Sequence, residues 1–290
     1  MVPPRLLVAC VLVSGCGGSS PVLQRNAAGG DDAADVVSAA DAARAPENVG
    51  GVQLTSTNAT TANPPTEGST ALAVFSPAAV SACPPETIVD GCSLIDCRPL
   101  LNVSDAQVSG GSVLVTGTKQ PINLTPDLKK TPLYGALNWP GRLWDGGEAL
   151  QVVVAGDVAP AFTLSLIAPA YVTVNAPVWS TGGAKLSIPR AKDLDVAWSG
   201  GGAGKVVVWL TVGAAGGAYI VNCQYPAQSG SGKVSTKVLG SLPTDGSANS
   251  IRIESETVVT ATVSGWTTTF RATATANAPT GVASAEFVLE

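Results

Sequence analysis

Two pairs of carboxylates are the side chains best placed for acid–base chemistry: Asp193 with Asp195, and Glu254 with Glu256. Residues two apart lie on the same side of a strand, so each pair could flank a glycosidic bond as acid and base or acid and nucleophile. The apolar residues that alternate with them would take the inner face of the strand. We therefore expect both pairs to lie on a solvated outer face.

The composition narrows the remaining catalytic chemistry. The sequence has no histidine, which excludes Ser-His-Asp and Cys-His machinery and leaves carboxylates, lysine or tyrosine as general acids and bases. The glycine-rich segment 199–205 departs from a phosphate-binding loop and joins two expected strands, so we interpret it as a hairpin loop. Neither Asp193/Asp195 nor Asp90/Asp96 matches a calcium-binding loop. We predict no metal, no cofactor and no enzymatic activity.

Aromatic side chains offer a second kind of chemistry, because a sugar ring can stack on a flat indole. The six tryptophans are Trp139, Trp144, Trp179, Trp198, Trp209 and Trp266. The segment 137–147 is rich in Pro and Gly and is expected to form a loop. Trp139, Arg142 and Trp144 in this loop are the candidate ligand-binding residues. The alternative is that both rings pack onto the end of the domain.

Four cysteines lie beyond residue 80: Cys83, Cys92, Cys97 and Cys223. An even number in an exported chain predicts two disulfides, of which four cysteines allow three connectivities. Cys223 lies in an expected strand, so a bridge from it to the 83–97 segment would join the start of the module to its core. A zinc site is disfavoured because the sequence has no CxxC pair and no histidine.

The N-terminal segment predicts the cellular location of the protein. A short apolar run from Leu6 to Val13 follows Arg5 and ends in Val13-Ser14-Gly15-Cys16, the pattern of a secretory signal with small residues before its cleavage site. With a cysteine at that site, the segment resembles the lipobox of bacterial lipoprotein precursors. The resemblance implies a signal peptide at 1–15, lipidation of Cys16 and a membrane anchor. The absence of Asp after Cys16 favours the outer membrane, in the periplasm or at the surface.

Residues 16–80 have the composition of a linker. They contain small, polar and Pro-rich stretches with few large apolar residues. Such a segment buries too little apolar surface to offset the entropy of ordering its backbone. We expect a disordered tether between the lipidated Cys16 and the folded module.

Residues 81–290 alternate apolar and polar side chains with a period of two, which predicts half-buried strands. The clearest expected strands are 150–154, 162–168, 194–198, 206–212, 251–263, 266–272 and 285–289. A turn is expected at Ser264-Gly265 and a single short helix at Thr236–Leu242. Many short strands with Gly, Pro and Asn between them favour an all-β fold, an antiparallel β-sandwich or jelly roll. The segment 172–177 is the candidate seam if the module has two subdomains.

Alternation also predicts which side of a strand each tryptophan takes. Trp198 and Trp266 share the parity of core-facing neighbours and are expected inside. Trp209 has the opposite parity from Val206, Val208 and Leu210, so it should lie on the outer surface or beneath a loop.

A net charge of −5 without a basic cluster argues against a nucleic-acid partner. The order of lipobox, linker, cysteine-rich entry and immunoglobulin-like or jelly-roll module resembles bacterial envelope lipoproteins, from which no activity is carried over. We expect a lipid-anchored protein of the cell envelope whose non-catalytic β-sandwich binds an envelope glycan or protein or has a structural role. The alternatives are a carboxylate-dependent polysaccharide-active enzyme and an assembly component that binds only proteins.

Overall fold

The computed structural model describes residues 47–57, 68–79, 87–97, 107–129, 134, 137–179, 185–214, 217–243, 249–278, 281–282 and 284–290. The expected signal peptide, Cys16, most of the expected linker and Cys83 lie outside these residues. No helix in the described part of the chain is long and apolar enough to cross a membrane.

Strands dominate the described residues. They are β1 Glu47–Ser56, β2 Ser69–Ala79, β3 Thr87–Val89, β4 Cys92–Asp96, β5 Val113–Thr116, β6 Ile122–Leu124, β7 Leu137–Trp139, β8 Ala149–Val154, β9 Phe162–Ile167, β10 Val172–Ala176, β11 Leu186–Ile188, β12 Leu194–Gly200, β13 Lys205–Ala214, β14 Gly217–Pro226, β15 Ser231–Val234, β16 Ser250–Val263, β17 Trp266–Thr275, β18 Asn277–Ala278, β19 Gly281–Val282 and β20 Ser284–Leu289. A 3₁₀ turn η1 (Ala227–Ser229) and one helix α2 (Thr236–Ser241) complete the described elements.

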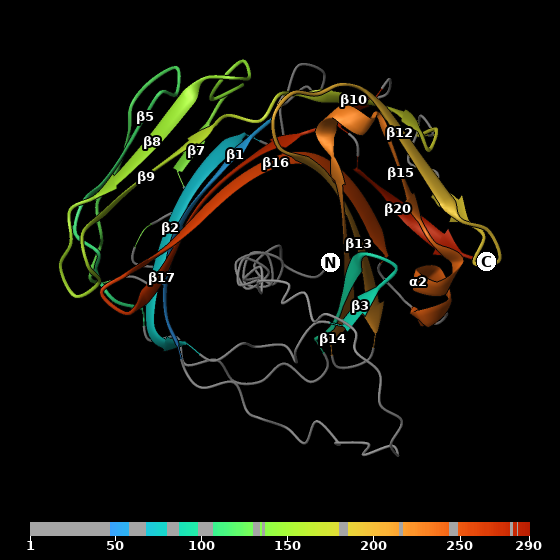
Figure 1. The fold of residues 1–290 in the computed structure, drawn as a ribbon, viewed down its shortest axis with the longest axis horizontal. Coiled ribbons are helices and arrows are strands. Elements are labelled where there is room, and N and C mark those ends of the chain that lie inside the picture. Colours follow the sequence, from blue (N-terminus) through green and yellow to red (C-terminus); the bar gives the residue numbers. More distant parts are fainter. Residues whose placement is uncertain are drawn as a thin grey trace, which may run out of the picture.

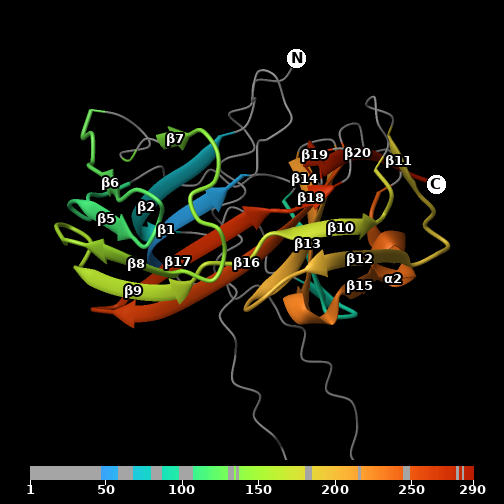
Figure 2. The same ribbon diagram turned by 90° about the horizontal axis from the view of Figure 1, so that it is seen from above.

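Three sheets build two sandwiches. An 11-stranded sheet, ordered β3-β4-β14-β13-β16-β17-β1-β2-β7 with β11 and β20 to one side, is shared by both. The sheet β6-β5-β8-β9 packs against one end of it, and the sheet β15-β12-β10-β18-β19 packs against the other. Figure 1 shows the shared sheet bent into an arch with the two smaller sheets on its outer side, and Figure 2 shows the same two units from above. We call them the first and the second sandwich.

The prediction of an all-β sandwich is confirmed. Most strand pairs are antiparallel, but β1 pairs with β17, β10 with β18 and β11 with β20 in parallel. Each sandwich has its own core cluster. The chain enters the second cluster first at Cys92, returns to the first from Val113 to Ala168, and enters the second again at Val172. Strand β16 brings the chain back across both, because its first half lies over the second core and its second half over the first.

The linker prediction is wrong for the described residues before 80. Residues 47–56 and 69–79 form β1 and β2, two long strands of the shared sheet, and their side chains enter the first core. Gly50 on β1 lies directly against the ring of Phe75 on β2. A Cβ atom added to Gly50 would lie 2.6 Å from Phe75 Cδ1. The small residues that suggested a linker therefore include one, Gly50, that the packing requires.

Several local predictions are confirmed. The tight turn between β16 and β17 is formed by Ser264 and Gly265, with φ of 49° and 78°, as a two-residue hairpin requires. Helix α2 begins after Ser235, whose Oγ accepts a hydrogen bond from Val238 N. A disulfide joins Cys92 on β4 to Cys223 on β14, 131 residues apart. Cys97 is also disulfide-bonded.

Candidate functional site

The loop that carries Trp139, Arg142 and Trp144 is folded into the first sandwich. The ring of Trp144 is fully buried, and its Nε1 donates a hydrogen bond to Pro169 O over 3.0 Å. Trp139 is half-buried against the same core. The guanidinium carbon of Arg142 lies 4.1 Å from the centre of the Tyr171 ring. Trp144 presents no face to a sugar, and the packing alternative holds for this residue.

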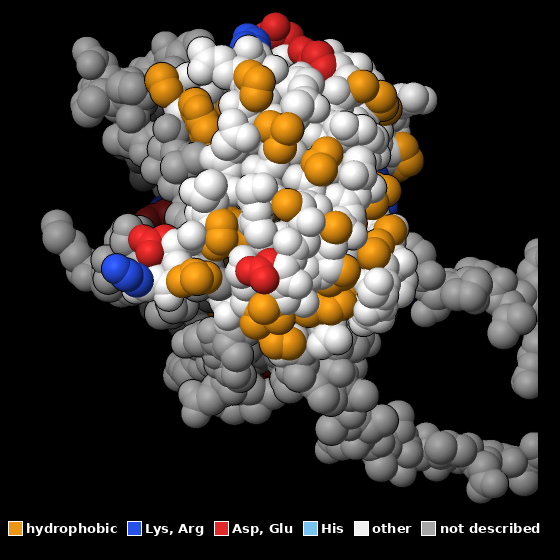
Figure 3. Space-filling model, turned by 90° about the vertical axis from the view of Figure 1, so that its left-hand side faces the viewer, with side chains coloured by type: hydrophobic (Ala, Val, Ile, Leu, Met, Phe, Trp, Pro, Cys, Tyr) orange, Lys and Arg blue, Asp and Glu red, His pale blue; other side chains and the backbone are white. Residues whose placement is uncertain are grey.

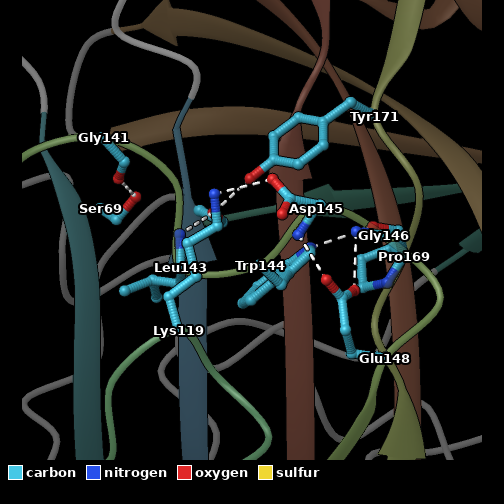
Figure 4. A network of polar contacts seen from close by, with 11 residues as sticks. Ser69, Lys119, Gly141, Leu143, Trp144, Asp145, Gly146, Glu148, Pro169 and Tyr171 are labelled. Carbon is cyan, nitrogen blue, oxygen red and sulfur yellow. Dashed lines mark hydrogen bonds and ion pairs between the residues drawn. The ribbon is translucent and has the colours of Figure 1, made fainter.

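Hydrogen bonds tie this loop to its surroundings on several sides (Figure 4). Leu143 N donates to Ser56 Oγ over 2.8 Å, and Ser56 Oγ is also hydrogen-bonded to the hydroxyl of Tyr171. Burial raises the pKa of Tyr171 to about 12, so its hydroxyl stays protonated at neutral pH. These contacts connect β1, the loop and the start of β10, and they serve the fold.

The far end of the loop is held by a carboxylate. Glu148 accepts hydrogen bonds from the backbone N–H groups of Asp145 and Gly146, both over 2.7 Å. Burial acts to raise the pKa of Glu148, but these backbone donors lower it below its ordinary value. Lys119 Nζ lies 2.7 Å from Asp145 Oδ1. The polar groups of the loop named above are thus paired with neighbouring parts of the first sandwich.

The expectation that Glu254 and Glu256 lie on a solvated face is wrong. They do point away from both cores, but only 4% and 5% of their surfaces are exposed. They lie on the side of the shared sheet that faces the inside of the arch in Figure 1, which we call the arch face. The alternation on β16 correctly separated the core side from the other side. It could not show that the other side is also covered.

Each of the two glutamates has a cationic partner. Glu254 Oε2 lies 3.1 Å from Arg252 Nε, and Glu256 Oε2 lies 3.3 Å from Arg271 Nη1. Trp209 Nε1 donates a hydrogen bond to Glu254 Oε1 over 2.7 Å. Strand register brings the groups together, since Trp209 on β13 is opposite Arg252 on β16.

The electrostatics of this cluster are dominated by burial. Burial raises the pKa of Glu256, the cation of Arg271 lowers it, and the net shift is upward. Within the residues that the structure describes, neither Glu256 Oε2 nor Arg252 Nε forms a well-aligned hydrogen bond, so both contacts are ion pairs held mainly by charge. Removing one partner of such a buried pair typically costs about 3–5 kcal/mol.

A raised carboxyl pKa is a property of general acids, but accessibility argues against that role here. A glycosidase needs both carboxyl groups within reach of the substrate bond. Glu254 and Glu256 are enclosed and engaged with Arg252, Arg271 and Trp209. The arrangement is suited to joining β13, β16 and β17 beneath the arch.

Asp193 and Asp195, in contrast, are on the surface as expected. Asp193 accepts a hydrogen bond from Thr236 N over 2.8 Å and lies 3.3 Å from Lys233 Nζ. The backbone donor of Thr236, followed by Lys233, lowers the pKa of Asp193. Asp90 similarly pairs with Lys237 at 3.3 Å. These carboxylates hold the start of α2, and no cluster in the described residues has the donors to bind a metal.

Sequence reasoning missed Arg252, Arg271 and Trp209 as members of the carboxylate cluster. The available signal was weak: Arg252 and Glu254 alternate on one strand, whereas Arg271 and Trp209 come from two other strands. Cross-strand register was needed to join them. No protein-family model matches the chain, and no curated protein is significantly similar to it in sequence.

Proposed function

We propose that this chain is a lipid-anchored protein of the bacterial cell envelope whose β module has a non-catalytic role in structure or binding. The anchor rests on the lipobox that ends at Cys16, and the outer membrane is the favoured location. Among the binding roles, contact with other envelope proteins is favoured over contact with glycans, because the ring of Trp144 is enclosed by the first core.

One observation supports the non-catalytic role most directly. The pair best suited to acid–base chemistry, Glu254 and Glu256, is 4% and 5% exposed and is neutralised by Arg252 and Arg271. Within a buried cluster of this kind, the charges stabilise one arrangement of strands and offer no open position to a substrate. Because both sandwiches share one sheet, surfaces on the two sandwiches that contact a partner would keep fixed positions relative to each other.

The anchor is tested by expressing the full-length chain in a diderm bacterium with labelled fatty acid. We expect the wild-type protein to lose residues 1–15 and to carry acyl chains on Cys16, as measured by intact mass and by label. The variant Cys16→Ala should be neither labelled nor cleaved at this site. Cys10→Ala is the matched control, because Cys10 leaves with the leader and its loss should change nothing. An unmodified thiol at Cys16, or a retained leader, would overturn the anchor.

The enzymatic alternative is tested with Glu254→Gln and Glu256→Gln in the same full-length protein. Envelope polysaccharides are incubated with the wild type and both variants, and release of reducing ends is measured. We expect no turnover by any of the three. Turnover by the wild type that either variant abolishes, with unfolding transitions unchanged, would replace the proposed role with hydrolysis.

A further inference from the structure

Half of strand β16 has one edge that pairs with no strand in the described part of the chain. Strand β13 pairs with β16 only from Ser250 to Glu256, where Lys205 is the last partner. From Thr257 to Val263, the strand pairs with β17 on one side and with no other strand among the described residues. The second half of β16 is thus a terminal strand of the shared sheet in the first sandwich.

The alternation of an antiparallel ladder tells which backbone groups face this edge. Ala276 N on the β17 side donates to Ile253 O, so odd-numbered residues of β16 direct their N–H and C=O groups toward β17. The even-numbered residues direct theirs the opposite way. Beyond Glu256, these are Val258, Thr260 and Thr262, whose side chains are also exposed on the arch face.

This edge lacks the features that normally prevent strands from pairing between molecules. Proteins protect edges with short strands, charges, prolines or bulges. The terminal strands β3, β6, β7 and β19 have two or three residues, and β15 carries Lys233. Residues 257–270 contain no charged residue and no proline, and the register of β16 with β17 is continuous. Alternating Thr and Val also have high strand propensity.

A second uncharged edge lies beside the first. Strand β9, Phe162–Ile167, ends the four-stranded sheet, has no charge and lies near β16. In Figure 2 the two strands run along the same margin of the first sandwich. Val259 and Val263 contact the core there but are only half-buried. The first core is thus only partly covered at this margin by the described residues.

The outer face of the four-stranded sheet is less suited to a partner. Figure 3 shows its apolar side chains singly or in small groups among uncharged polar ones. Gln151, Thr163 and Ser165 are exposed there, alongside Leu114 and Ile167. Scattered apolar residues of this kind are ordinary surface, so the edge and not the face is the candidate contact.

We propose that a second copy of this chain pairs with the free half of β16, antiparallel and about a twofold axis at Thr260. Thr260 of one copy then faces Thr260 of the other, and Val258 faces Thr262. All three pairs are of the hydrogen-bonded type, because these residues direct their N–H and C=O groups outward. Every facing pair is small, β-branched and uncharged.

The identity of the partner follows from closure and charge. A second copy carries the rest of its own sheet behind the edge, so twofold pairing consumes both edges and the assembly stops at two. A foreign extended peptide would leave a new edge on its far side. The protein has a net charge of −5, and the uncharged 257–270 hairpin lets two copies meet without like charges in contact.

The register is tested by single cysteines in the full-length protein in its membrane. Thr260→Cys should form a disulfide-linked dimer, since Cα atoms of a hydrogen-bonded pair are about 5.5 Å apart and disulfides span about 4.4–6.8 Å. Thr262→Cys is the matched control, because two copies of residue 262 would be about 14 Å apart at 3.4 Å per residue. A mixture of Val258→Cys and Thr262→Cys should cross-link. Non-reducing gels and the mass of the product are the readouts.

Three results would overturn the dimer. They are no cross-link at Thr260→Cys, equal cross-linking at Thr260→Cys and Thr262→Cys, and a Thr260→Cys product whose mass is that of another protein. Charge variants give an independent test by native mass spectrometry in detergent. Thr260→Lys and Thr260→Glu should each weaken the dimer by about tenfold or more, and mixing them should restore a heterodimer. Gln151→Lys, on the exposed outer face of the four-stranded sheet, should leave the dimer intact. Failure of the mixture to pair would contradict the twofold register.

Discussion

The first and second sandwiches are built on the same sheet but are stabilised by different kinds of contact. The second sandwich is held by the Cys92–Cys223 disulfide and by charged side chains at the ends of α2. Arg190 donates hydrogen bonds to Gly240 O and Leu242 O at the C-terminal end of the helix, each over 2.6 Å.

The first sandwich has no disulfide among its described residues and depends on close packing of rings and glycines. Phe75 packs edge-to-face against Tyr134 and Phe162, with ring centres 5.6 and 6.2 Å apart. Its open margin at β9 and β16 has no counterpart of the α2 contacts. The difference is that covalent and charged contacts hold the second sandwich, whereas the first has a long uncharged edge at the second half of β16.

The largest expected effect is in the first sandwich. Trp144→Ala removes a fully buried ring and leaves Pro169 O without its donor, so the free energy of unfolding should fall by about 4 kcal/mol. Hydrogen exchange should rise in β1, β2, β5 and β8 and stay unchanged in β12 and β13. Trp144→Phe keeps a ring and should cost less. Equal loss of protection in both sandwiches would show that they unfold as one unit.

The reciprocal variant acts on the second sandwich. Cys92→Ala combined with Cys223→Ala opens a covalent loop of 131 residues and should lower the free energy of unfolding by about 3 kcal/mol. Substitution is preferable to a reductant because Cys97 is also disulfide-bonded. Protection should now be lost in β4 and β14. Loss of protection confined to β1 and β2 would contradict the separation between the two cores.

The two regions also differ in how well the sequence predicted them. Alternation correctly placed Trp198 and Trp266 inside, and the Ser264-Gly265 turn and α2 were found because their signals are local. Strands β1 and β2 were missed because several of their core positions hold glycine or alanine, and because β1 pairs with β17 across more than half of the chain.

The candidate site was predicted less well than the fold, for a related reason. Periodicity assigned Glu254 and Glu256 to the side opposite the core, which is correct. Their burial depends on what covers the arch face, and their partners Arg271 and Trp209 come from β17 and β13. Neither fact is encoded in the β16 segment itself.

The buried cluster of Glu254 and Glu256 with their arginine partners gives a test based on pH. Glu256 has the ordinary carboxyl pKa of 4.5 in the unfolded chain, and burial raises its pKa in the folded protein. At a pH between the unfolded-state pKa and the folded-state pKa, the folded protein therefore holds a proton that the unfolded chain has lost. The free energy of unfolding therefore decreases as pH rises through this window. Glu256→Gln cannot titrate and should gain stability relative to the wild type as pH rises from 4 to 8, measured by denaturant unfolding at each pH.

The matched control for this series is Glu286→Gln. Glu286 pairs with Lys185 at 3.2 Å but is largely exposed, so its removal should leave the pH profile almost unchanged. If the free energy of unfolding of the wild type instead rose relative to that of Glu256→Gln with rising pH, the attraction of Arg271 for the Glu256 carboxylate would outweigh the effect of burial. The charges of the cluster would then make a net favourable contribution to the packing of β13, β16 and β17.

The smallest expected change in stability comes from a proline substitution on the free edge of β16, which is compared with one on the edge that pairs with β17. Thr260 directs its N–H outward, so Thr260→Pro removes no bond to β17 and should cost the single chain about 1 kcal/mol or less. Val259 directs its N–H toward β17, so Val259→Pro breaks the ladder and should cost about 3 kcal/mol. Because a dimer adds stability only where it is populated, the deficit of Thr260→Pro relative to the wild type should be small at low protein concentration and should grow as the concentration rises. Val259→Pro should be less stable at every concentration, and denaturant midpoints measured across a dilution series distinguish the two. Identical concentration dependence in the two variants would mean that the outward groups of Val258, Thr260 and Thr262 bind no second copy.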